Sequence, residues 1–354
     1  LTRVQAQQLA RDTLTQIDLN RSAGDAGDRN LETYLTSLLG DLVGLYPDLL
    51  RGSYDDLLTR AIYWPGYLYL GADATTRDEL IARCVASYDD LPTFTYLLGA
   101  LVWIGDEAVQ ALFLRWRNAP PVAESTLTYP LQEYTLLAGW ELTPAGQRRN
   151  LYHDANYALI PTDGAPPTAV PGPVGVVEPF TTAEALPGAS TTCPWCGLEL
   201  ITLFTFDLRD PRLAWLGLVG ERLRIITCNY CVRFLPLLAD FDLFGGAAWS
   251  VENGVEQTVF EGREYGIEPL PERRLVLGNP RRTPYVGATV GGSQIGGAPQ
   301  WAQGPAYTRC PRCQQRMVCV GQLEPTALAD GDTGMLTTLL CAHCHLASTV
   351  YDRD

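Results

Sequence analysis

The chain has 354 residues and a mass of 38.8 kDa; 46% of its residues are hydrophobic and 19% are charged. This composition is that of a globular protein with two or three domains, and it excludes a disordered, collagenous or coiled-coil protein. The 40 acidic and 26 basic side chains give a formal net charge of −14 and a pI near 4.7. Because so acidic a protein lacks the basic face that binds phosphate backbones, we expect no nucleic-acid partner.

All 26 basic residues are arginine, and the chain contains no lysine. This excludes Schiff-base chemistry, a phosphate-loop lysine and every lysine-directed modification. Drift in a GC-rich genome and avoidance of lysine tagging both account for the composition, and the sequence does not separate them.

No segment of the sequence has the length of a membrane span. The longest largely apolar run, residues 94–104, is too short to cross a bilayer and is followed by Gly105, Asp106 and Glu107. The first twenty residues are polar and charged and carry no apolar secretory core. We therefore expect a cytoplasmic protein that does not contact a membrane.

Residues 1–160 are expected to form an α-helical domain. Within residues 96–104, Leu97, Leu98, Leu101 and Ile104 recur at the spacing of a helix buried on one face. Gly105 then ends this helix, and Asp106 can cap the next one. Short turns separate further helix-length segments at 31–45, 53–63, 76–88 and 127–137. Antiparallel helix pairs of this kind bury a core only against their neighbours, so the pattern favours a HEAT-like helical array.

The chain changes character after residue 160. Seven prolines within residues 161–190 indicate a linker or an extended crossing segment. Beyond it, residues 198–208 alternate in the manner of a β-strand, with many β-branched and aromatic side chains. We expect residues 191–354 to form a β-rich domain with two zinc-ribbon-like units, at 191–245 and 285–354.

The cysteines give the strongest signal in the sequence. Eight of the ten form four Cys-x-x-Cys pairs, and two such turns brought together by a hairpin supply the four thiolates of a tetrahedral zinc site. Pairing neighbours predicts two structural zinc ions, one held by Cys193, Cys196, Cys228 and Cys231 and one held by Cys310, Cys313, Cys341 and Cys344. The stretches between the paired turns, 31 and 27 residues, leave room for a hairpin or a small extra element.

The two cysteine units follow one plan. Cys-Pro-Trp-Cys at 193–196 and Cys-Pro-Arg-Cys at 310–313 each lead into a strand, and a second strand enters the second cysteine pair. Asp240 follows Cys228 by twelve residues, and Asp352 follows Cys341 by eleven. This order predicts an internal duplication. Two units with the same order of cysteines and strands favour structural metal sites. Four thiolates also occupy the coordination position that a catalytic zinc ion keeps open.

Other readings of the cysteines remain open. Cys-Pro-x-Cys also occurs in glutaredoxin-like thiol-disulfide oxidoreductases, where the first thiol lies at a helix start. Disulfides are a second alternative, although the paired spacing and the polar N-terminus speak against them. His343 or His345, which flank Cys344, is a third alternative as a replacement ligand. Cys84 and Cys319 are expected to be small buried hydrophobic residues.

A glycine-rich stretch precedes the second cysteine unit at residues 291–303. It reads as a tight bend followed by an aromatic anchor, and it lacks the Lys-Ser/Thr ending of a phosphate loop. Gly296, Gly297, Pro299 and Trp301, with Gln303 as a looser match, resemble the Gly-Gly-x-Pro-x-Trp segment of the YwqG-like domain family. A similar segment occurs in the eukaryotic programmed-cell-death zinc proteins.

That resemblance covers residues 285–354. It implies a β-rich, internally duplicated fold and, among the eukaryotic relatives, a role as a dedicated chaperone or binding partner of other proteins. The helical first half and the two intact metal units of this chain depart from the pattern, so no particular partner carries over.

The preferred hypothesis is a non-enzymatic zinc protein that acts as an adaptor or chaperone-like partner of another protein. Two of the three histidines flank Cys344, which leaves His153 alone for a Ser-His-Asp or Cys-His arrangement. The alternative is an enzyme with a cleft between the two halves, in which Glu252 and Glu256 serve as acid and base. Six arginines near the predicted sites are expected to offset the charge of the thiolates: Arg222, Arg224, Arg233, Arg309, Arg312 and Arg316.

Overall fold

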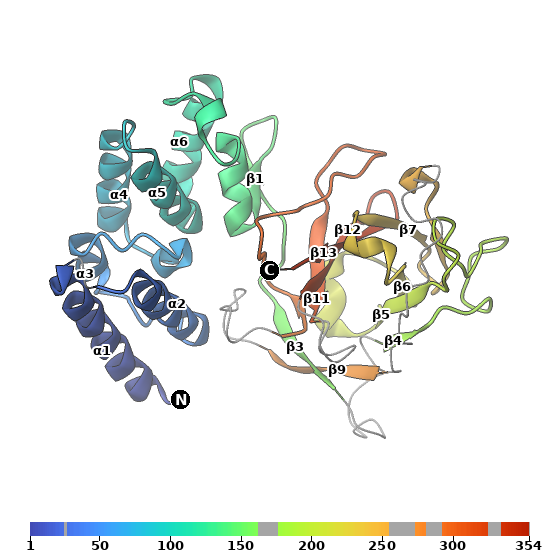
Figure 1. Ribbon diagram of the computed structural model, residues 1–354. Helices are drawn as coiled ribbons and strands as arrows, with labels where there is room; N and C mark the ends of the chain where they lie inside the picture. The colour runs from blue at the N-terminus through green and yellow to red at the C-terminus, as the bar shows by residue number, and fades with distance from the viewer. Residues whose placement is uncertain (25–26, 162–175, 255–272, 281–291, 325–333, 354) are drawn as a thin grey trace. The chain divides into compact units, whose positions relative to one another are not determined.

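The structure is a computed structural model (Figure 1), and it describes residues 1–24, 27–161, 176–254, 273–280, 292–324 and 334–353. The described residues belong to two compact units. The first is Leu1–Asn150, here called the helical unit, and the second begins at Leu151, here called the sheet unit. Each unit has its own cluster of buried hydrophobic side chains.

The helical unit contains α-helices, short 3-10 helices and one hairpin. The α-helices are α1 (Arg3–Ser22), α2 (Arg29–Leu45), α3 (Tyr54–Thr59), α4 (Ala74–Ala86), α5 (Leu91–Ile104) and α6 (Glu107–Asn118). The 3-10 helices are η2 (Gly66–Tyr69), η3 (Glu124–Thr126) and η4 (Leu131–Ala138), and the hairpin is formed by β1 (Trp140–Leu142) and β2 (Arg148–Asn150).

Aspartate side chains begin four of these helices. Asp28, Asp73, Asp90 and Asp106 each accept a hydrogen bond from a backbone N–H in the first turn of α2, α4, α5 and α6. Such caps satisfy backbone donors that the helix leaves unpaired. The predicted cap at Asp106 is confirmed, because its Oδ1 lies 3.1 Å from the N atom of Val109.

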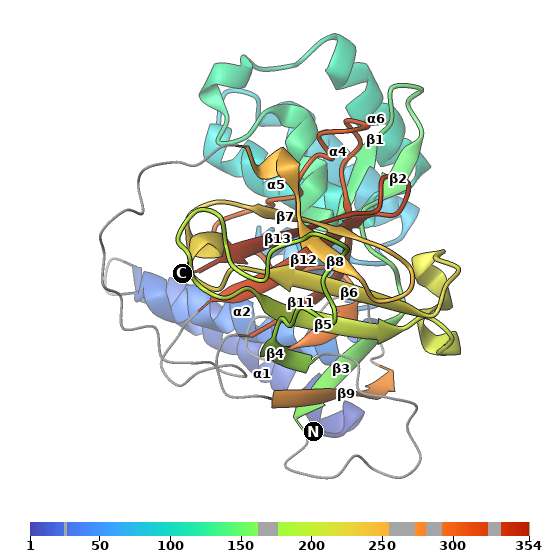
Figure 2. The same cartoon turned by 90° about the vertical axis from the view of Figure 1, so that its right-hand side faces the viewer.

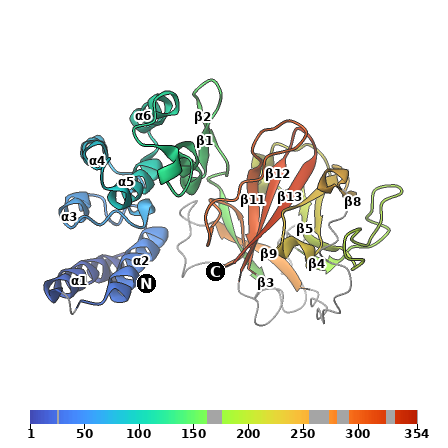
Figure 3. The ribbon, with the colours of Figure 1, turned by 45° about the horizontal axis from the view of Figure 1, so that its top comes forward.

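Helix α5 lies at the centre of the helical core. Of its four predicted apolar side chains, Leu97, Leu98 and Leu101 have no solvent exposure and Ile104 is half-buried. Figure 3 shows α5 among the other helices of the unit. Gly105 ends α5 in the left-handed conformation, with a φ of 54°. The six α-helices range from 6 to 20 residues in length. A HEAT-like repeat stays a prediction.

The all-helical expectation fails near the end of the first half. Residues 131–138, expected in an α-helix, form the 3-10 helix η4 between Pro130 and the left-handed Gly139. Residues 140–150 form the β1–β2 hairpin, and Glu141 of one strand pairs with Arg149 of the other at 2.5 Å. The physical reason is the cluster of turn residues, Gly139 and Gly146, both with positive φ, which breaks the helical period.

Strands dominate the sheet unit, and eleven described strands form one sheet in the order β6-β5-β4-β9-β3-β10-β11-β12-β13-β7-β8. All paired neighbours in this order run antiparallel. The strands are β3 (Asn156–Pro161), β4 (Val176–Pro179), β5 (Ile201–Asp207), β6 (Arg222–Thr227), β7 (Leu237–Phe241), β8 (Ala247–Trp249), β9 (Arg273–Pro280), β10 (Gln294–Gly296), β11 (Val318–Leu323), β12 (Met335–Cys341) and β13 (Leu346–Asp352).

The sheet curls so that strands from its two ends meet (Figure 2). Strand β6 contacts β7 and β8, and a parallel bridge joins Arg222 at the start of β6 to Phe244 in the β7–β8 turn. Buried side chains such as Phe204, Phe206 and Ile225 fill the inside of the curl. The sheet therefore encloses a core of its own.

Two boundaries differ from the sequence expectation. Residues 156–160, expected in the helical domain, form β3 together with Pro161, and this strand pairs with β9 and β10. Of the expected linker, residues 162–175 lie outside the described part, while Val176–Pro179 forms β4 between β5 and β9. Pairing with distant strands decides both cases. Among the described helices, none combines the length and the apolar character needed to cross a membrane.

Candidate metal centres

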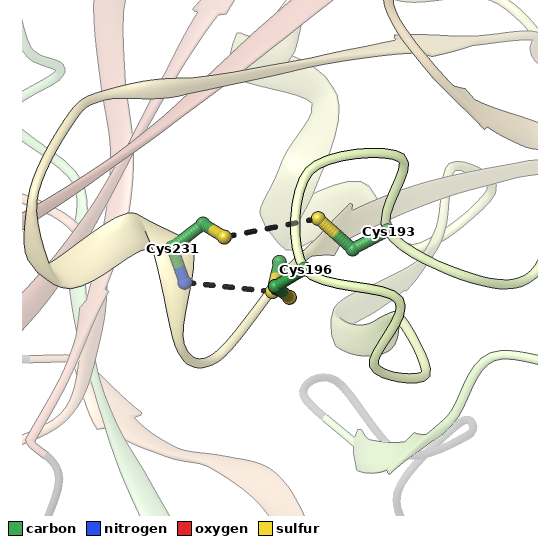
Figure 4. A group of neighbouring side chains, drawn as sticks. Cys193, Cys196 and Cys231 are labelled. Atoms are coloured by element: carbon green, nitrogen blue, oxygen red, sulfur yellow. Dashed lines mark hydrogen bonds between the residues drawn. The ribbon is translucent and has the colours of Figure 1, made fainter. Parts of the chain in front are cut away.

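The first centre gathers four thiols from two turns. Cys193 and Cys196 lie in the turn before β5, and Cys228 and Cys231 follow β6 directly. Figure 4 shows the side chains of Cys193, Cys196 and Cys231 converging, and the sulfur atoms of Cys193 and Cys231 lie 3.8 Å apart. Those of Cys196 and Cys228 lie 3.5 Å apart. Since β5 and β6 pair side by side, they bring the two turns together.

The second centre repeats this arrangement. Cys310 and Cys313 lie in the turn before β11, Cys341 ends β12, and Cys344 lies in the turn between β12 and β13. The sulfur atoms of Cys313 and Cys341 lie 3.6 Å apart. In each centre, the four sulfur atoms lie within 4.8 Å of one another. The structure therefore brings together the two sets of four cysteines that the sequence pairs.

The sulfur separations fit a metal ion better than a covalent bridge. A Zn–S bond of about 2.3 Å in a tetrahedron requires sulfur atoms about 3.8 Å apart, whereas a disulfide requires about 2.05 Å. Three sulfur pairs, at 3.5, 3.6 and 3.8 Å, lie close to the tetrahedral edge, the other pairs lie within 4.8 Å, and all ten cysteines are free thiols. Each of the two four-cysteine clusters could hold a metal ion, and their strand-and-turn setting is zinc-ribbon-like.

The same backbone hydrogen bonds build the first turn of each centre. Cys193 donates its N–H to the carbonyl of Leu198, and Cys310 donates its own to Gln315, at 2.7 and 2.8 Å. Gly197 and Gln314 each return an N–H to the carbonyl of the first cysteine, at 2.9 and 2.8 Å. This register orients both cysteine side chains of a turn toward one point. The duplication predicted from the sequence thus extends to the individual hydrogen bonds of the turn.

Both turns place a residue in the left-handed region at the same position. The φ angles are 76° at Gly197 and 60° at Gln314. Glycine adopts this region freely, whereas a residue with a Cβ does so at a cost of about 1 kcal/mol. The side chain of Gln314 is held by a 2.9 Å hydrogen bond from its Nε2 to the carbonyl of Pro311.

The third residue of each Cys-Pro-x-Cys turn distinguishes the centres. In the first centre this residue is Trp195, which is 7% exposed and packs edge-on against Trp249 of β8 with ring centroids 5.2 Å apart. An apolar contact therefore supports the first centre.

In the second centre the corresponding residue is Arg312. Its guanidinium pairs with Asp240 at 2.7 Å and with Glu252 at 3.1 Å. Its Nη1 also donates to the carbonyl oxygen of Cys344 at 3.1 Å. Arg312 thus ties the Cys310–Cys313 turn to the Cys341–Cys344 turn and to the β7–β8 region.

The β7–β8 hairpin connects the supports of the two centres. It follows Cys231 of the first centre, and β7 pairs with β13, which begins two residues after Cys344 of the second. Trp249, which contacts Trp195, and Asp240, which pairs with Arg312, both lie on this hairpin. Distortion of one centre is therefore expected to reach the other through these strands.

The arginines expected to offset thiolate charge have varied partners. Arg224 is buried in β6 and pairs with Glu178 and Glu184, and burial lowers its pKa. Arg233 lies over the ring of Tyr351. Arg312, by contrast, donates a hydrogen bond to the carbonyl of Cys344, which belongs to a different cysteine turn of the same centre.

Neighbouring thiols perturb one another strongly in both clusters. Hydrogen bonds from the thiols of Cys228 and Cys231 lower the pKa of Cys193. The same hydrogen bonds raise the pKa values of Cys228 and Cys231, because these two thiols keep their protons while they donate to Cys193. In the second cluster, the backbone N–H of Gln315 lowers the pKa of Cys313, and burial raises that of Cys341 to about 12. A metal ion would therefore displace protons when it binds.

Two of the three histidines, His153 and His345, stack on aromatic rings. The ring of His345 stacks on Phe241 with centroids 5.4 Å apart, and neither His343 nor His345 belongs to the four-residue cluster. His153 stacks on Trp215, and its Nδ1 accepts a 3.0 Å hydrogen bond from the N–H of Ala155. His153 thus caps a local turn.

Two further expectations for cysteines can be compared with the structure. Residues 194–196 form a turn that leads toward β5, so Cys193 does not lie at the start of a helix as a glutaredoxin-like thiol would. Cys84 and Cys319 are buried outside both clusters, and burial raises the pKa of each to about 12. Both behave as buried core residues.

The glycine-rich segment is fastened to the sheet by polar side chains. Gln322 of β11 accepts from the N–H of Gln300 and donates to its carbonyl, each at 2.8 Å, and Asp352 accepts from the N–H of Gln303 at 3.3 Å. Gly296 and Gly297 have φ of 69° and 75°, and a Cβ at Gly296 would overlap the carbonyl oxygen of Ala155.

Two members of the segment have separate surroundings. Pro299 lies between these glycines and the anchored Gln300, and the Trp301 ring packs edge-on against Tyr307. The segment is therefore built into the sheet as a structural element.

The sequence alone does not predict the contacts of several residues that support the two centres. Asp240 was noticed as a repeated feature, but its pairing with Arg312 depends on the β7–β13 register. Glu252, a candidate acid or base of the alternative enzyme hypothesis, forms an ion pair with Arg312, and Glu256 lies outside the described residues. Trp249 carried no local signal, because its partner Trp195 is 54 residues away in the chain.

The chain is similar to a bacterial protein over much of its length. The chain is 32% identical over 263 residues to the uncharacterized protein YpfL of Salmonella typhimurium, a match that covers 73% of this chain and 58% of the relative. The chain therefore spans less than two thirds of that relative's length, and its name assigns no activity. No family model and no solved structure matches the chain significantly.

Proposed function

We propose that this chain is a zinc protein in which two structural ions, each bound by four cysteines, hold the sheet unit together, and that it works by binding another protein. The observation that carries the metal assignment is the gathering of four sulfur atoms within 4.8 Å of one another in each cluster, with closest pairs at 3.5 Å in the first and 3.6 Å in the second. Four soft thiolates in a closed tetrahedral set suit zinc, and they leave no coordination position for a reacting water.

A protein partner is supported by apolar side chains on the exterior of the sheet unit. Val219 is 91% exposed and Phe244 is 75% exposed. They lie on neighbouring loops, because Glu221 donates its N–H to the carbonyl of Leu243 at 2.8 Å and Arg222 is bridged to Phe244. Large apolar side chains in contact with water favour burial against a partner. An adaptor or chaperone-like role, as the resemblance to the YwqG-like family implies, is part of this proposal.

Metal analysis of the purified chain tests the first half of the proposal. Native mass spectrometry and elemental analysis are expected to give two zinc ions per chain, and the double variant C310S/C341S is expected to retain one or none. Cys84→Ala is the matched control, because this buried thiol lies outside both clusters, and it should retain two ions. A metal-free chain, or iron in place of zinc, would contradict the assignment.

Partner capture tests the second half. A protein crosslinked to the native chain is identified, purified and titrated against it by calorimetry. V219S/F244S is expected to weaken this binding while two zinc ions remain bound, because neither residue is a ligand. Unchanged affinity in that variant, or the absence of any partner that binds with purified components, would exclude this surface and refute the binding role assigned to it. The same purified chain should show no turnover in a thiol-disulfide exchange assay.

A further inference from the structure

The helical unit contains a hollow that the metal centres and the sheet do not explain. Its volume is about 560 Å³, and its lining comes from the end of α1, the first turns of α2, residues 61–64 and helix α5. Tyr63, Trp64 and Tyr96 supply aromatic rings, and Arg21, Arg29 and Glu32 supply charges. This set of six residues is called the aromatic hollow below. Its volume lies within the range of about 300–1,000 Å³ typical of small-molecule sites.

The C-terminal end of helix α3 positions residues 61–64 in the lining of the hollow. Ile62 donates its N–H to the carbonyl of Leu57 at 3.0 Å, and Ala61 donates its own to Leu58 at 3.1 Å. These two bonds form a Schellman motif, whose left-handed position is usually glycine. Here Ala61 occupies it, with a φ of 50°. The motif turns the chain sharply, so that Tyr63 and Trp64 follow immediately in the hollow.

The aromatic rings of the hollow differ in exposure. Tyr63 is 9% exposed, and its hydroxyl accepts a 3.0 Å hydrogen bond from Nη1 of Arg83, which fixes the ring. Trp64 is 44% exposed and Tyr96 is 52% exposed. A fixed inner ring and two accessible outer rings provide faces on which a planar ligand can stack.

The charged side chains that line the hollow include one arginine without an ion-pair partner among the described residues. Arg21 donates through Nε to Oε1 of Glu32 at 3.0 Å and through Nη1 to the carbonyl of Arg60, so this arginine and this glutamate neutralise each other. Arg29 is exposed and has no ion-pair partner among the described residues. The lining therefore carries a formal charge of +1 in a chain whose net charge is −14.

We propose that the aromatic hollow binds a carboxylate attached to an aromatic body. The guanidinium of Arg29 would form paired hydrogen bonds with the carboxylate, a geometry that arginine favours. The rings of Trp64 and Tyr96 would stack on the aromatic part. The same chemistry occurs in a free aromatic acid and at the C-terminus of a peptide that ends in an aromatic residue. This site is independent of the metal centres and of the partner surface of the sheet unit.

Titrations of the full-length, metal-loaded chain test this assignment with three matched indole probes. Indole-3-acetate carries a carboxylate, tryptamine an ammonium group and indole no charge, so they separate charge recognition from stacking. Binding is followed by amide chemical shifts and by calorimetry. We expect indole-3-acetate to bind in the millimolar range or tighter, and at least about tenfold more tightly than tryptamine, with the largest shifts at residues 61–64.

Substitutions then assign the binding groups. Arg29→Gln should weaken indole-3-acetate binding about tenfold and leave the helical circular dichroism unchanged, because the side chain is exposed. Arg11→Gln on α1 is the matched control, since Arg11 is also exposed and bonds to the neutral side chain of Gln8, and this variant should bind as the unaltered chain does. Trp64→Ala should weaken indole and indole-3-acetate alike.

A pair of peptides ending in tryptophan distinguishes the two sources of the carboxylate. If the free-acid peptide binds more tightly than indole-3-acetate and its C-terminal amide does not bind, the ligand is a peptide terminus; if indole-3-acetate binds more tightly than both, it is a free acid. Equal binding of tryptamine and indole-3-acetate, an Arg29→Gln variant with unchanged affinity, or no binding of any probe would overturn the proposal.

Discussion

The two candidate metal centres have the same cysteine turn but different supports. Each turn is closed by equivalent hydrogen bonds, from Cys193 to Leu198 and from Cys310 to Gln315. The first centre then rests on a buried tryptophan pair, whereas Arg312 in the second rests on two carboxylates. Because the same hydrogen bonds occur with different supports, the turn itself sets the ligand geometry. The third residue of the turn differs, tryptophan in the first centre and arginine in the second, and it determines how each turn is attached to the sheet.

Loss of the ligands should affect both centres alike and gives the largest expected effect. Structural zinc contributes apparent binding free energies of about 10–16 kcal/mol, more than the net stability of most domains. C193S/C228S and C310S/C341S are each expected to unfold the sheet unit, while the helical unit keeps its helices because its core contains no metal ligand. Far-UV circular dichroism and amide exchange measure this. A sheet unit that keeps native exchange protection in either variant would contradict the structural role.

Acid should release metal from both centres. Burial raises the pKa of Cys341 to about 12, and the thiols of Cys228 and Cys231 also have raised pKa values. These groups are protonated in the metal-free protein at neutral pH and must lose protons on binding. The apparent affinity therefore falls as pH falls, by about 1.4 kcal/mol per pH unit for each proton released. Competition with a chromophoric chelator between about pH 5 and pH 8 measures the slope; an affinity independent of pH would be inconsistent with thiolate ligation.

Substitution of the third residue of each cysteine turn should affect the two centres differently. Trp195→Ala removes a buried ring and is expected to cost about 3–5 kcal/mol in the free energy of unfolding. Arg312→Met removes partly exposed ion pairs and is expected to cost about 1 kcal/mol, with a loss that shrinks as salt is added. Chemical denaturation at low and high salt measures both values. Equal costs, or a salt-sensitive Trp195→Ala variant, would show that the supports do not differ in kind.

The smallest effect concerns the left-handed position of each turn. Gly197→Ala is expected to cost about 1 kcal/mol through backbone conformation alone, because no atom lies within 4 Å of the added Cβ. Gln314→Gly makes the second turn like the first and is expected to stabilise it by less than about 1 kcal/mol, since the hydrogen bond to Pro311 is lost. Thermal unfolding of both variants gives the signs. A stabilising Gly197→Ala would contradict the shared geometry.

The sequence predicts the ligands well because their signal is local. A Cys-x-x-Cys pair defines a turn within four residues, and the order of the pairs indicates which turns meet. The buried face of α5 follows in the same way from Leu97, Leu98 and Leu101. The sequence misses β3, because strand formation at 156–161 depends on pairing with β9 and β10, more than a hundred residues further along the chain. The sequence does not predict the contacts that support the two centres for the same reason, since strand register brings Trp249 and Asp240 to their partners.

The central claim is that eight thiolates hold two zinc ions as permanent structural elements. Native mass spectrometry of the chain, purified without added metal and followed during stepwise treatment with a chelator, tests this most directly. We expect two zinc ions per chain, with loss of metal accompanied by loss of exchange protection in the sheet unit and by exposure of nine reactive thiols, the eight ligands and Cys319 of β11. A chain that is folded and metal-free, or one whose cysteines pass between thiols and disulfides without unfolding, would contradict the account.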